Sequence, residues 1–342
     1  MANNENRLQG PLRAGLIADA ERIASLAAAV EQCDLLTPLA QAGMPQAAAA
    51  PRVPWLDDPR VLLANPELEA VLLASSTRQN ASLAAAAAGR GLHVWHLPPL
   101  ACTFAEGAEA VARAKRAESV WRVASWWEYV FEHVWHEVAW PADFQPLYSE
   151  LRVSVRGPAH DSWRAGVAET AGGALADAGY RMLEVLVAGR GLPETAGGTV
   201  GQYRTPAPAA TGAAEDTTLA ILGYRSGTAL VRAAWDQPPF GQQLLHTSAA
   251  VTALLTEEEL VLLDRDGETL DRRPLPGGFL AQELLRFAEA VRGQARDRAL
   301  ATLDRHLAVS AVLEAVYLSA RTGHAESPRK YYQVLGLPEP RS

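Results

Sequence analysis

The chain has few of the residues that several classes of protein require. Only two of its 342 residues are cysteines, Cys33 and Cys102, which argues against a disulfide framework and indicates a reducing compartment. Lysine also occurs only twice, at Lys115 and Lys330. No apolar run approaches the roughly 18 residues of a membrane span, and the first ten residues lack the apolar core of a signal peptide. We therefore expect a cytoplasmic protein that does not enter a membrane.

The chain also has no excess of basic residues. The formal net charge is -8 and the isoelectric point is about 5.6. An acidic chain without a basic stripe is a poor binder of nucleic acid. Its length and its hydrophobic content of 49% suffice for two domains with a large core.

A glycine-rich loop is absent where the pattern of elements requires one. Residues 12–17 (LRAGLI) predict a buried strand, and residues 24–30 predict the helix that follows it. In a dinucleotide-binding unit the turn between them carries G-x-G-x-x-G. The first glycine makes the turn, the second admits the pyrophosphate, and the third allows close packing of helix and strand. Here these positions are Ala18, Ala20 and Ile23.

The charge of this turn is also unfavourable for a phosphate group. Asp19 and Glu21 place carboxylates at the helix N-terminus, where the phosphates of a dinucleotide would lie. A ribose-binding acid is expected about 20 residues after the first glycine, and residues 36–39 (LTPL) contain none. The chain is built like a nicotinamide enzyme, yet its cofactor loop is predicted to be closed.

The order of the predicted elements divides the chain into two domains. Up to about residue 125, strands alternate with helices, which is typical of right-handed βαβ units in a doubly wound parallel sheet. After about residue 150, alternating strands with hairpin turns at Ser226–Gly227 and Asp266–Gly267 predict an open, mostly antiparallel sheet flanked by helices. We predict a Rossmann-like domain over 1–125, an α+β domain over 126–326 closed by helices within 279–321, and a tail over 327–342.

Three segments are predicted with particular boundaries. Residues 33–36 predict a weak strand, and the alanine- and proline-rich residues 40–54 predict a loop. Residues 172–187 predict one continuous helix.

Four segments, in order along the chain, carry a family resemblance: 81–101, 103–117, 163–184 (WRAGVAETAGGALADAGYRMLE) and 311–323. Together they resemble motifs of the glucose-fructose oxidoreductase/inositol dehydrogenase (Gfo/Idh/MocA) family, and the similarity runs from about residue 12 to about residue 327. The resemblance implies an NAD- or NADP-dependent oxidoreductase that acts on a sugar or polyol. It also implies association through the open sheet.

The resemblance further implies where protons would be transferred. In the family a lysine in a Glu-Lys-Pro loop usually donates the proton. Aligned from His93, this tripeptide falls on Leu97, Pro98 and Pro99, so the proline is present and the lysine position is Pro98, which cannot move a proton.

A second acid-base element in the family is Asp-x-x-x-His, whose spacing of four places both groups on one helix face. Asp177 matches the aspartate, while Arg181 stands in place of the histidine. Arginine stays protonated and is not a general base at neutral pH. Arg181 can bind a carboxylate or phosphate, or it can pair with Asp177.

Other positions have more than one interpretation. His96, beside the lost lysine position, is either a replacement acid-base group or a packing or surface histidine. Ser76, Thr77 and Asn80 correspond to the family's Thr-Pro-x-x-x-His stretch, with part of its hydrogen-bonding character. The positions that the resemblance assigns to cofactor binding, whether functional or vestigial, are Ala18, Asp19, Ala20, Ser76, Thr77 and Pro99.

Residues 121–140 contain two further features. His133 and His136 are three residues apart, but without an H-E-x-x-H pattern they indicate a polar helix face, and we predict no metal site. The same stretch is dense in tryptophan, tyrosine and phenylalanine. It predicts a buried seam, a sugar-stacking platform or a partner-binding hot spot.

Two functional hypotheses follow. In the first, the chain is a catalytically silent member of the family that binds a sugar-like ligand or serves as a partner subunit in a homo- or hetero-oligomer. In the second, it is an active but atypical NAD(P)-dependent oxidoreductase acting on a sugar or polyol. Asp177, His96 or Tyr180 would then transfer the proton.

Overall fold

The computed structural model describes residues 10–43, 50, 52–159, 162–203, 212–293 and 295–340. Two compact units make up the chain. The first is bounded by Met1–Ala101, Glu106–Ala124 and Gly278–Asp304, and the second by Cys102–Ala105, Ser125–Gly277 and Arg305–Ser342. Residues 278–304 therefore belong to the first unit, whereas the sequence-based boundary placed them in the second.

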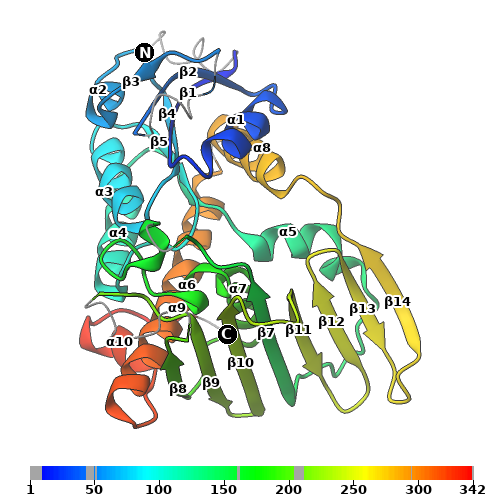
Figure 1. The fold of residues 1–342 in the computed structure, drawn as a ribbon. Helices are drawn as coiled ribbons and strands as arrows, with labels where there is room; N and C mark the ends of the chain where they lie inside the picture. Colours follow the sequence, from blue (N-terminus) through cyan, green and yellow to red (C-terminus); the bar gives the residue numbers. More distant parts are fainter. Residues whose placement is uncertain are drawn as a thin grey trace. The chain divides into compact units, whose positions relative to one another are not determined.

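The first unit contains a six-stranded parallel sheet in the order β3-β2-β1-β4-β5-β6 (Figure 1). Its apolar strands are buried on both faces, as expected when helices cover both sides of a parallel sheet. The predicted doubly wound class is confirmed. The strands are β1 (Leu12–Ala18), β2 (Leu36–Ala42), β3 (Trp55–Leu56), β4 (Ala70–Ala74), β5 (His93–His96) and β6 (Trp121–Val123); the helices are α1 (Ile23–Glu31), α2 (Pro59–Leu63), α3 (Thr77–Ala88), α4 (Phe104–Arg116) and α8 (Phe279–Arg292).

Helix α8 joins the first unit through its apolar face and through a buried ion pair. Leu284 and Phe287 are fully buried in the same cluster as Leu26 of α1. The Arg122 guanidinium on β6 donates to both carboxylate oxygens of Glu283 on α8, at 3.1 and 3.2 Å. Both side chains are almost inaccessible. A buried charge requires such a partner, so the pair ties this distant segment to the sheet.

The boundaries of β2 differ from the prediction. The strand begins at Leu36, where the predicted strand ends, and continues to Ala42, so residues 40–42 are not a loop. Pro38 and the buried Gln41 obscure the apolar pattern, and the register with β1 shifts between Ala14 and Gly15. Much of the remaining predicted loop, residues 44–49 and 51, lies outside the described residues.

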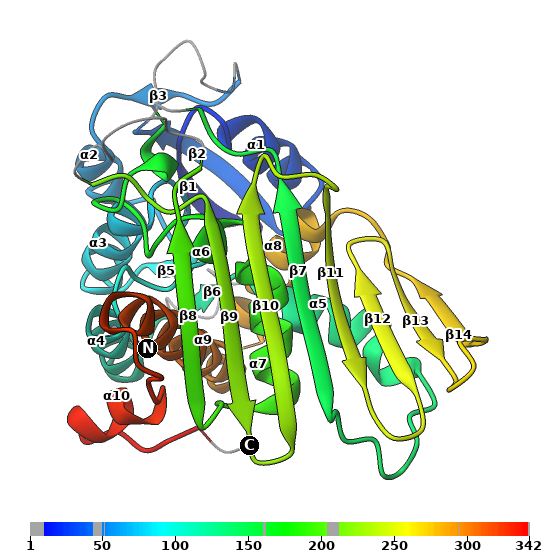
Figure 2. The same ribbon diagram turned by 60° about the horizontal axis from the view of Figure 1, so that its bottom comes forward.

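The second unit contains an eight-stranded sheet in the order β14-β13-β12-β11-β7-β10-β9-β8. All neighbouring pairs are antiparallel except β7 and β10, which are parallel, so the predicted open, mostly antiparallel sheet is confirmed. Helices α6 and α7 pack on one face, and Figure 2 shows the other face toward the viewer. The strands are β7 (Tyr148–Val155), β8 (Thr195–Gly201), β9 (Thr217–Tyr224), β10 (Gly227–Trp235), β11 (Gly241–Thr247), β12 (Thr252–Thr256), β13 (Glu259–Leu263) and β14 (Thr269–Pro274); the helices are α5 (Trp126–His133), α6 (Ala174–Asp177), α7 (Tyr180–Arg190), α9 (Arg296–Thr322) and α10 (Arg329–Val334). The residues of α9 up to Asp304 belong to the first unit.

The helix predicted over 172–187 is in fact two helices, α6 and α7. The chain turns at Gly179, whose amide donates to the Ala174 carbonyl oxygen at 3.0 Å. A methyl group on Gly179 would lie 2.8 Å from the Leu175 carbonyl oxygen, so the close turn requires glycine. The segment predicted as a tail contains α10, and β12 was not predicted. In the described part of the chain, no helix is both long and apolar enough to cross a membrane.

We expect Glu283→Gln to lower the free energy of unfolding by about 3–5 kcal/mol, because it removes the carboxylate charge that faces the buried Arg122 guanidinium. The measurement is urea unfolding at neutral pH. Arg113→Ala, which removes an exposed ion pair with Glu109, is the control and should cost at most about 1 kcal/mol. Equal effects of the two variants would contradict the anchoring role of the buried pair.

Candidate functional site

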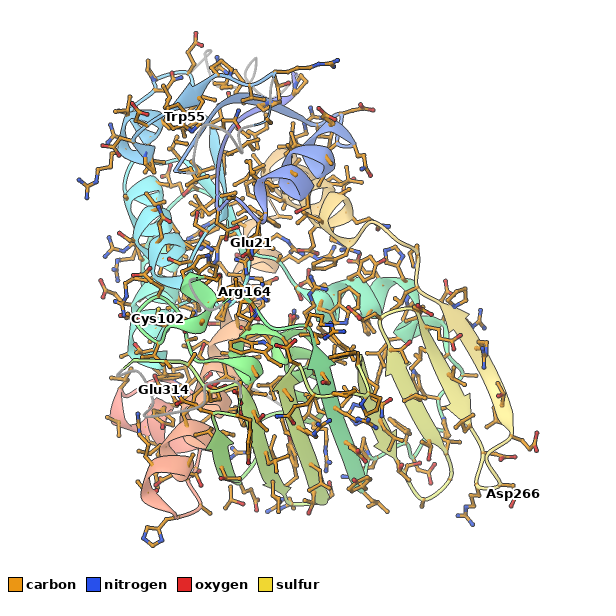
Figure 3. The ribbon with its side chains drawn as sticks, viewed as in Figure 1. Glu21, Trp55, Cys102, Arg164, Asp266 and Glu314 are labelled. Atoms are coloured by element: carbon orange, nitrogen blue, oxygen red, sulfur yellow. The ribbon has the colours of Figure 1, made fainter. Side chains whose placement is uncertain are left out.

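The turn between β1 and α1 is closed by its own carboxylate. The Asp19 Oδ1 atom accepts hydrogen bonds from the Glu21 and Arg22 amides at 3.0 and 2.9 Å. Its second oxygen lies 3.7 Å from the Arg22 guanidinium. Glu21 lies in the same turn, next to the start of α1 (Figure 3). Asp19 therefore binds amides of the kind that hold a phosphate in a dinucleotide-binding loop.

Ala18, Ala20 and Ile23, which stand at the positions of the three glycines, do not obstruct the turn equally. Ala18 and Ile23 are buried, and both side chains belong to the hydrophobic core of the first unit. Only Ala20 is exposed. The expectation that all three side chains stand where a cofactor needs bare backbone is therefore too broad. The obstacle at the surface consists of Ala20 and the Asp19 carboxylate.

The loop that follows β4 is held by internal hydrogen bonds. Asn80 is buried; its side chain accepts from the Ser75 amide at 2.9 Å and donates to the Ser75 carbonyl at 3.1 Å. The Arg22 guanidinium donates to the same carbonyl at 3.1 Å. Ser76 caps α3 by accepting from the Gln79 amide. Asn80 therefore braces the loop, and its side chain is not available at the surface.

A ribose-binding acid would lie farther along the chain than the sequence analysis placed it. Because β2 ends at Ala42, the carboxyl end of this strand lies at residues 41–43 and not at 36–39. The residues described there are Gln41, Ala42 and Gly43, so they contain no acid. Gln41 is buried, and its amide bonds to the backbone of Ala50 and Val53.

His96, at the end of β5, is fully buried. Its Nδ1 atom lies 2.8 Å from the Leu97 carbonyl oxygen, and its ring packs edge-on against Trp121. Burial lowers the pKa of His96 to about 4. The adjacent Pro98 and Pro99 are joined by a cis peptide bond. This environment fits a packing histidine and not a proton donor for a substrate.

In the second unit, Asp177 is paired with an arginine that the sequence analysis did not single out. The Arg164 guanidinium binds its carboxylate in bidentate fashion, at 3.0 and 2.6 Å. Arg181 instead lies 3.9 Å from Glu257 and over the Trp126 ring, at 5.4 Å from its centroid. Of the two alternatives for Arg181, pairing with Asp177 is thus not the main contact of this aspartate, because Arg164 binds it and the chain turns between α6 and α7.

The Gly172–Gly173 pair of the family-like motif allows a close backbone approach. Gly172 has φ +147°, and a methyl group there would overlap the Tyr317 ring. Gly173 donates to the buried Glu215 carboxylate at 2.6 Å, and the Tyr317 hydroxyl donates to it at 2.9 Å. Burial raises the pKa of Glu215, and these hydrogen bonds oppose the shift. Glu215 and Tyr317 lie far from the motif in sequence, so no local pattern indicated them.

Glu184 lies at the centre of a buried polar network. Its carboxylate accepts from the Ser125 hydroxyl at 2.5 Å and the Trp126 amide at 2.9 Å. The Arg305 guanidinium lies 4.0 Å away, and His306 lies 3.8 Å away.

Tyr180 is buried beside this network. Its hydroxyl lies 2.9 Å from Nδ1 of His306, and burial together with Glu184 raises the pKa of Tyr180 well above 10. These groups stabilise the packing of α5, α7 and α9, and Tyr180 is not exposed for proton transfer.

The aromatic cluster forms a row of ring contacts. Trp127, Trp135, Trp140 and Phe144 contact one another successively, with centroid separations of 4.5–5.4 Å. All four are partly exposed, whereas Trp126 is buried.

The two histidines of this segment make local contacts. His133 packs on Tyr129, and Nδ1 of His136 lies 2.7 Å from the Phe131 carbonyl oxygen. Within the described residues, no three His, Cys, Asp or Glu side chains are grouped as metal ligands.

Comparisons with known proteins identify the class of fold. Residues 15–125 match the Gfo/Idh/MocA family model, described as an oxidoreductase family with an NAD-binding Rossmann fold. No curated protein matches the sequence. An oxidoreductase from Thermotoga maritima has a TM-score of 0.75 at 17% identity and covers 94% of this chain and 99% of its own. A 3-ketoreductase from Actinomadura kijaniata, solved with TDP-benzene and NADP, has a TM-score of 0.76 at 18% identity, covering 91% and 98%. Levoglucosan dehydrogenase, in complex with NADH and levoglucosan, has a TM-score of 0.71 at 16% identity, covering 93% and 99%.

The chain thus has the fold of NAD(P)-binding oxidoreductases. Its residues 15–125 are similar to the Gfo/Idh/MocA family, and the likeness of the whole chain to the solved oxidoreductases is one of fold.

We expect burial of His96, and of His246 in the second unit, to make stability depend on pH. Their pKa values are lowered to about 4 and about 3, so below about pH 6.5 the unfolded chain binds protons that the folded chain does not. The free energy of unfolding should fall by roughly 1.4 kcal/mol per pH unit per histidine between about pH 6.5 and 4.

Urea unfolding over this range of pH measures the slope. His96→Asn should remove its share, while His136→Asn, at an exposed position, should leave the slope unchanged. A His96 imidazole that titrates near pH 6.5 by NMR would restore it as an acid-base candidate.

Proposed function

We propose that this chain is an oxidoreductase-family protein that has lost, or largely lost, NAD(P)-dependent sugar or polyol dehydrogenase activity. Its function is to bind a sugar-like ligand or to act as a partner subunit. The observation that carries the proposal is the hydrogen bonding of the Asp19 carboxylate to the Glu21 and Arg22 amides.

A pyrophosphate fits this turn poorly because Asp19 already binds the amides at the start of α1. A pyrophosphate would have to displace Asp19 from two hydrogen bonds, each of a kind worth about 1.5–3 kcal/mol. The displaced carboxylate would then stand beside the negatively charged phosphates. Since the described end of β2 also lacks a ribose-binding acid, the residues present do not fit NAD or NADP in the usual position.

The positions expected to transfer protons support the same conclusion. Pro98 has no titratable group, His96 is fully buried, and Asp177 is held by the Arg164 guanidinium. Tyr180 is buried against His306. None of these groups combines surface exposure with a readily exchanged proton, which general acid-base catalysis requires.

The ligand that we propose is sugar-like and carries an acidic group. Arg181 is 43% exposed and lies over Trp126. An exposed guanidinium in place of the family histidine favours a carboxylate or phosphate on the ligand.

The open sheet of the second unit is the proposed oligomer surface. Ile221 and Leu230 are directly paired across β9 and β10 and are 56% and 40% exposed. The same row continues through Glu150, Leu245 and Leu254. Figure 2 shows no helix among this unit's described residues across the face. Exposed apolar side chains on a broad sheet are suited to self-association, or to pairing with a related subunit.

The alternative is an active, atypical NAD(P)-dependent oxidoreductase acting on a sugar or polyol. The match of residues 15–125 to an NAD-binding family favours it. It requires Asp19 to leave the α1 amides when the cofactor binds. Cofactor affinity therefore separates the two functions.

We expect NADH and NADPH not to bind the purified protein below roughly millimolar, which corresponds to only about 4 kcal/mol. The triple variant Ala18→Gly/Asp19→Ser/Ala20→Gly should bind more tightly, because its amides are released from the carboxylate, yet it should remain inactive while Pro98 is present. Nicotinamide fluorescence and calorimetry are the measurements. Asp58→Ser, at the cap of α2, is the matched control. Micromolar binding by the unmodified protein would establish the alternative.

We expect the protein to be oligomeric and Ile221→Arg to dissociate it, because the substitution buries an unpaired charge in the proposed interface. Light scattering coupled to gel filtration measures the mass. Val61→Arg on α2 is the control, since Val61 is 57% exposed, much like Ile221. An unchanged mass for Ile221→Arg, or a monomeric unmodified protein, would argue against self-association through this face.

A further inference from the structure

A cavity of about 970 Å³ lies in the first unit, at the edge of the parallel sheet where the strands begin. Leu12 at the start of β1, His93 at the start of β5 and Ser119 just before β6 are among its lining residues. The Asp19 turn follows the other end of β1. This cavity is therefore separate from the position where the family binds its cofactor, and the inference below does not depend on the proposed function.

Three hydrogen-bond donors in the cavity lining could donate to a ligand. The Ser119 hydroxyl is buried and has no partner among the described residues, and the same is true of Nε of Arg296. The other end of the Arg296 guanidinium is fixed, because Nη2 donates to the Ala114 and Lys115 carbonyls at 3.1 and 2.6 Å. An anchored guanidinium with a free Nε–H is pre-oriented for an acceptor.

His93 supplies the third donor. Its Nδ1 atom accepts the Val120 amide at 3.0 Å, so the neutral ring carries its proton on Nε2. Burial lowers the pKa of His93, and the nearby Glu69 opposes this shift.

Several of the acceptors around the cavity, in contrast, are already engaged. The Glu69 carboxylate accepts from the Arg13 amide at 3.0 Å and from its guanidinium at 3.4 Å. The last carbonyls of α4 are bound by Arg296. The buried groups without a partner are therefore donors, and they favour a ligand that carries acceptors, while the Glu118 carboxylate in the same lining is exposed.

The charge and the shape of the cavity indicate which class of ligand it can bind. Among the lining residues, Arg90 and Arg296 balance the charges of Glu69 and Glu118. Arg13, beside the lining, pairs with Glu69, so that these groups together carry one net positive charge. The remaining walls are largely apolar, with Leu12, Leu63, Leu68, Leu92, Val120 and Val291. A site of this size and composition suits a small molecule with an apolar body and one charged group.

We propose that this cavity binds a small organic monocarboxylate, whose carboxylate accepts from Nε of Arg296 and from the Ser119 hydroxyl, while its apolar body packs among the leucines. Inorganic phosphate lacks the apolar body and is expected to bind much more weakly.

The test is calorimetric titration of the full chain with octanoate, with octanol as the neutral counterpart and inorganic phosphate as the second anion. Octanoate should bind at least about tenfold more tightly than either. Arg296→Met should weaken octanoate at least about tenfold, as expected for loss of a charge-assisted hydrogen bond. Ser119→Ala, which removes one neutral hydrogen bond, should weaken it roughly threefold.

Arg113→Met on the exposed face of α4 is the matched control and should leave octanoate affinity unchanged. Thermal unfolding of each variant establishes that it is folded. Should Arg296→Met prove unstable, Ser119→Ala and Arg296→Lys, which keeps the charge but loses Nε–H, provide the same test. Equal affinity for octanoate and octanol, no binding of octanoate, preferential binding of phosphate, or equal effects of Arg113→Met and Arg296→Met would each overturn the proposal.

Discussion

The functional interpretation of the first unit depends on the carboxylate of Asp19. A helix N-terminus presents amides that have no partner within the helix, and these amides are bound by a ligand, by water or by a nearby side chain. Here Asp19 takes the amides of Glu21 and Arg22, and Arg22 in turn bonds to the Ser75 carbonyl. The turn is thus satisfied without a cofactor. The fold still forms the strand-turn-helix of a dinucleotide-binding unit, because that geometry comes from the packing of β1 and α1 and not from the ligand.

Most of the fold could be predicted from the sequence because its elements carry strong local patterns. The strand predicted over 12–17 and the helix predicted over 24–30 lie within β1 and α1, and the hairpin turns at Gly227 and Gly267 were predicted from their residue types. The assignment of α8 to the first unit could not be predicted in this way. It depends on Arg122 and Glu283, which are 161 residues apart and meet only in the folded chain.

The candidate site was predicted less completely, again because some of its contacts join residues that are not close in the sequence. The sequence itself shows Ala18, Ala20 and Pro98 at the positions where the resemblance implies glycine and lysine. Local spacing, however, placed Arg181 and Asp177 on one face of one helix, where the two could pair, whereas the chain turns at Gly179 and Arg164 binds the aspartate. Arg164 belongs to the Trp-Arg segment of the family resemblance, so its presence was visible but its role was not.

Two buried hydrogen-bond networks of the second unit explain how this chain keeps the fold of that unit. Glu184 is fully buried among Ser125, Arg305 and His306, and Glu215 is buried against Gly173 and Tyr317. Removing any one partner would leave a buried polar group unsatisfied, which costs more than the bond itself contributes. The surface turn at Asp19 is under no such constraint, because an exposed loop can exchange a ligand for a side chain without disturbing the core. Catalytic groups can therefore be lost at the surface while the buried carboxylates continue to specify the packing of α5, α6, α7 and α9.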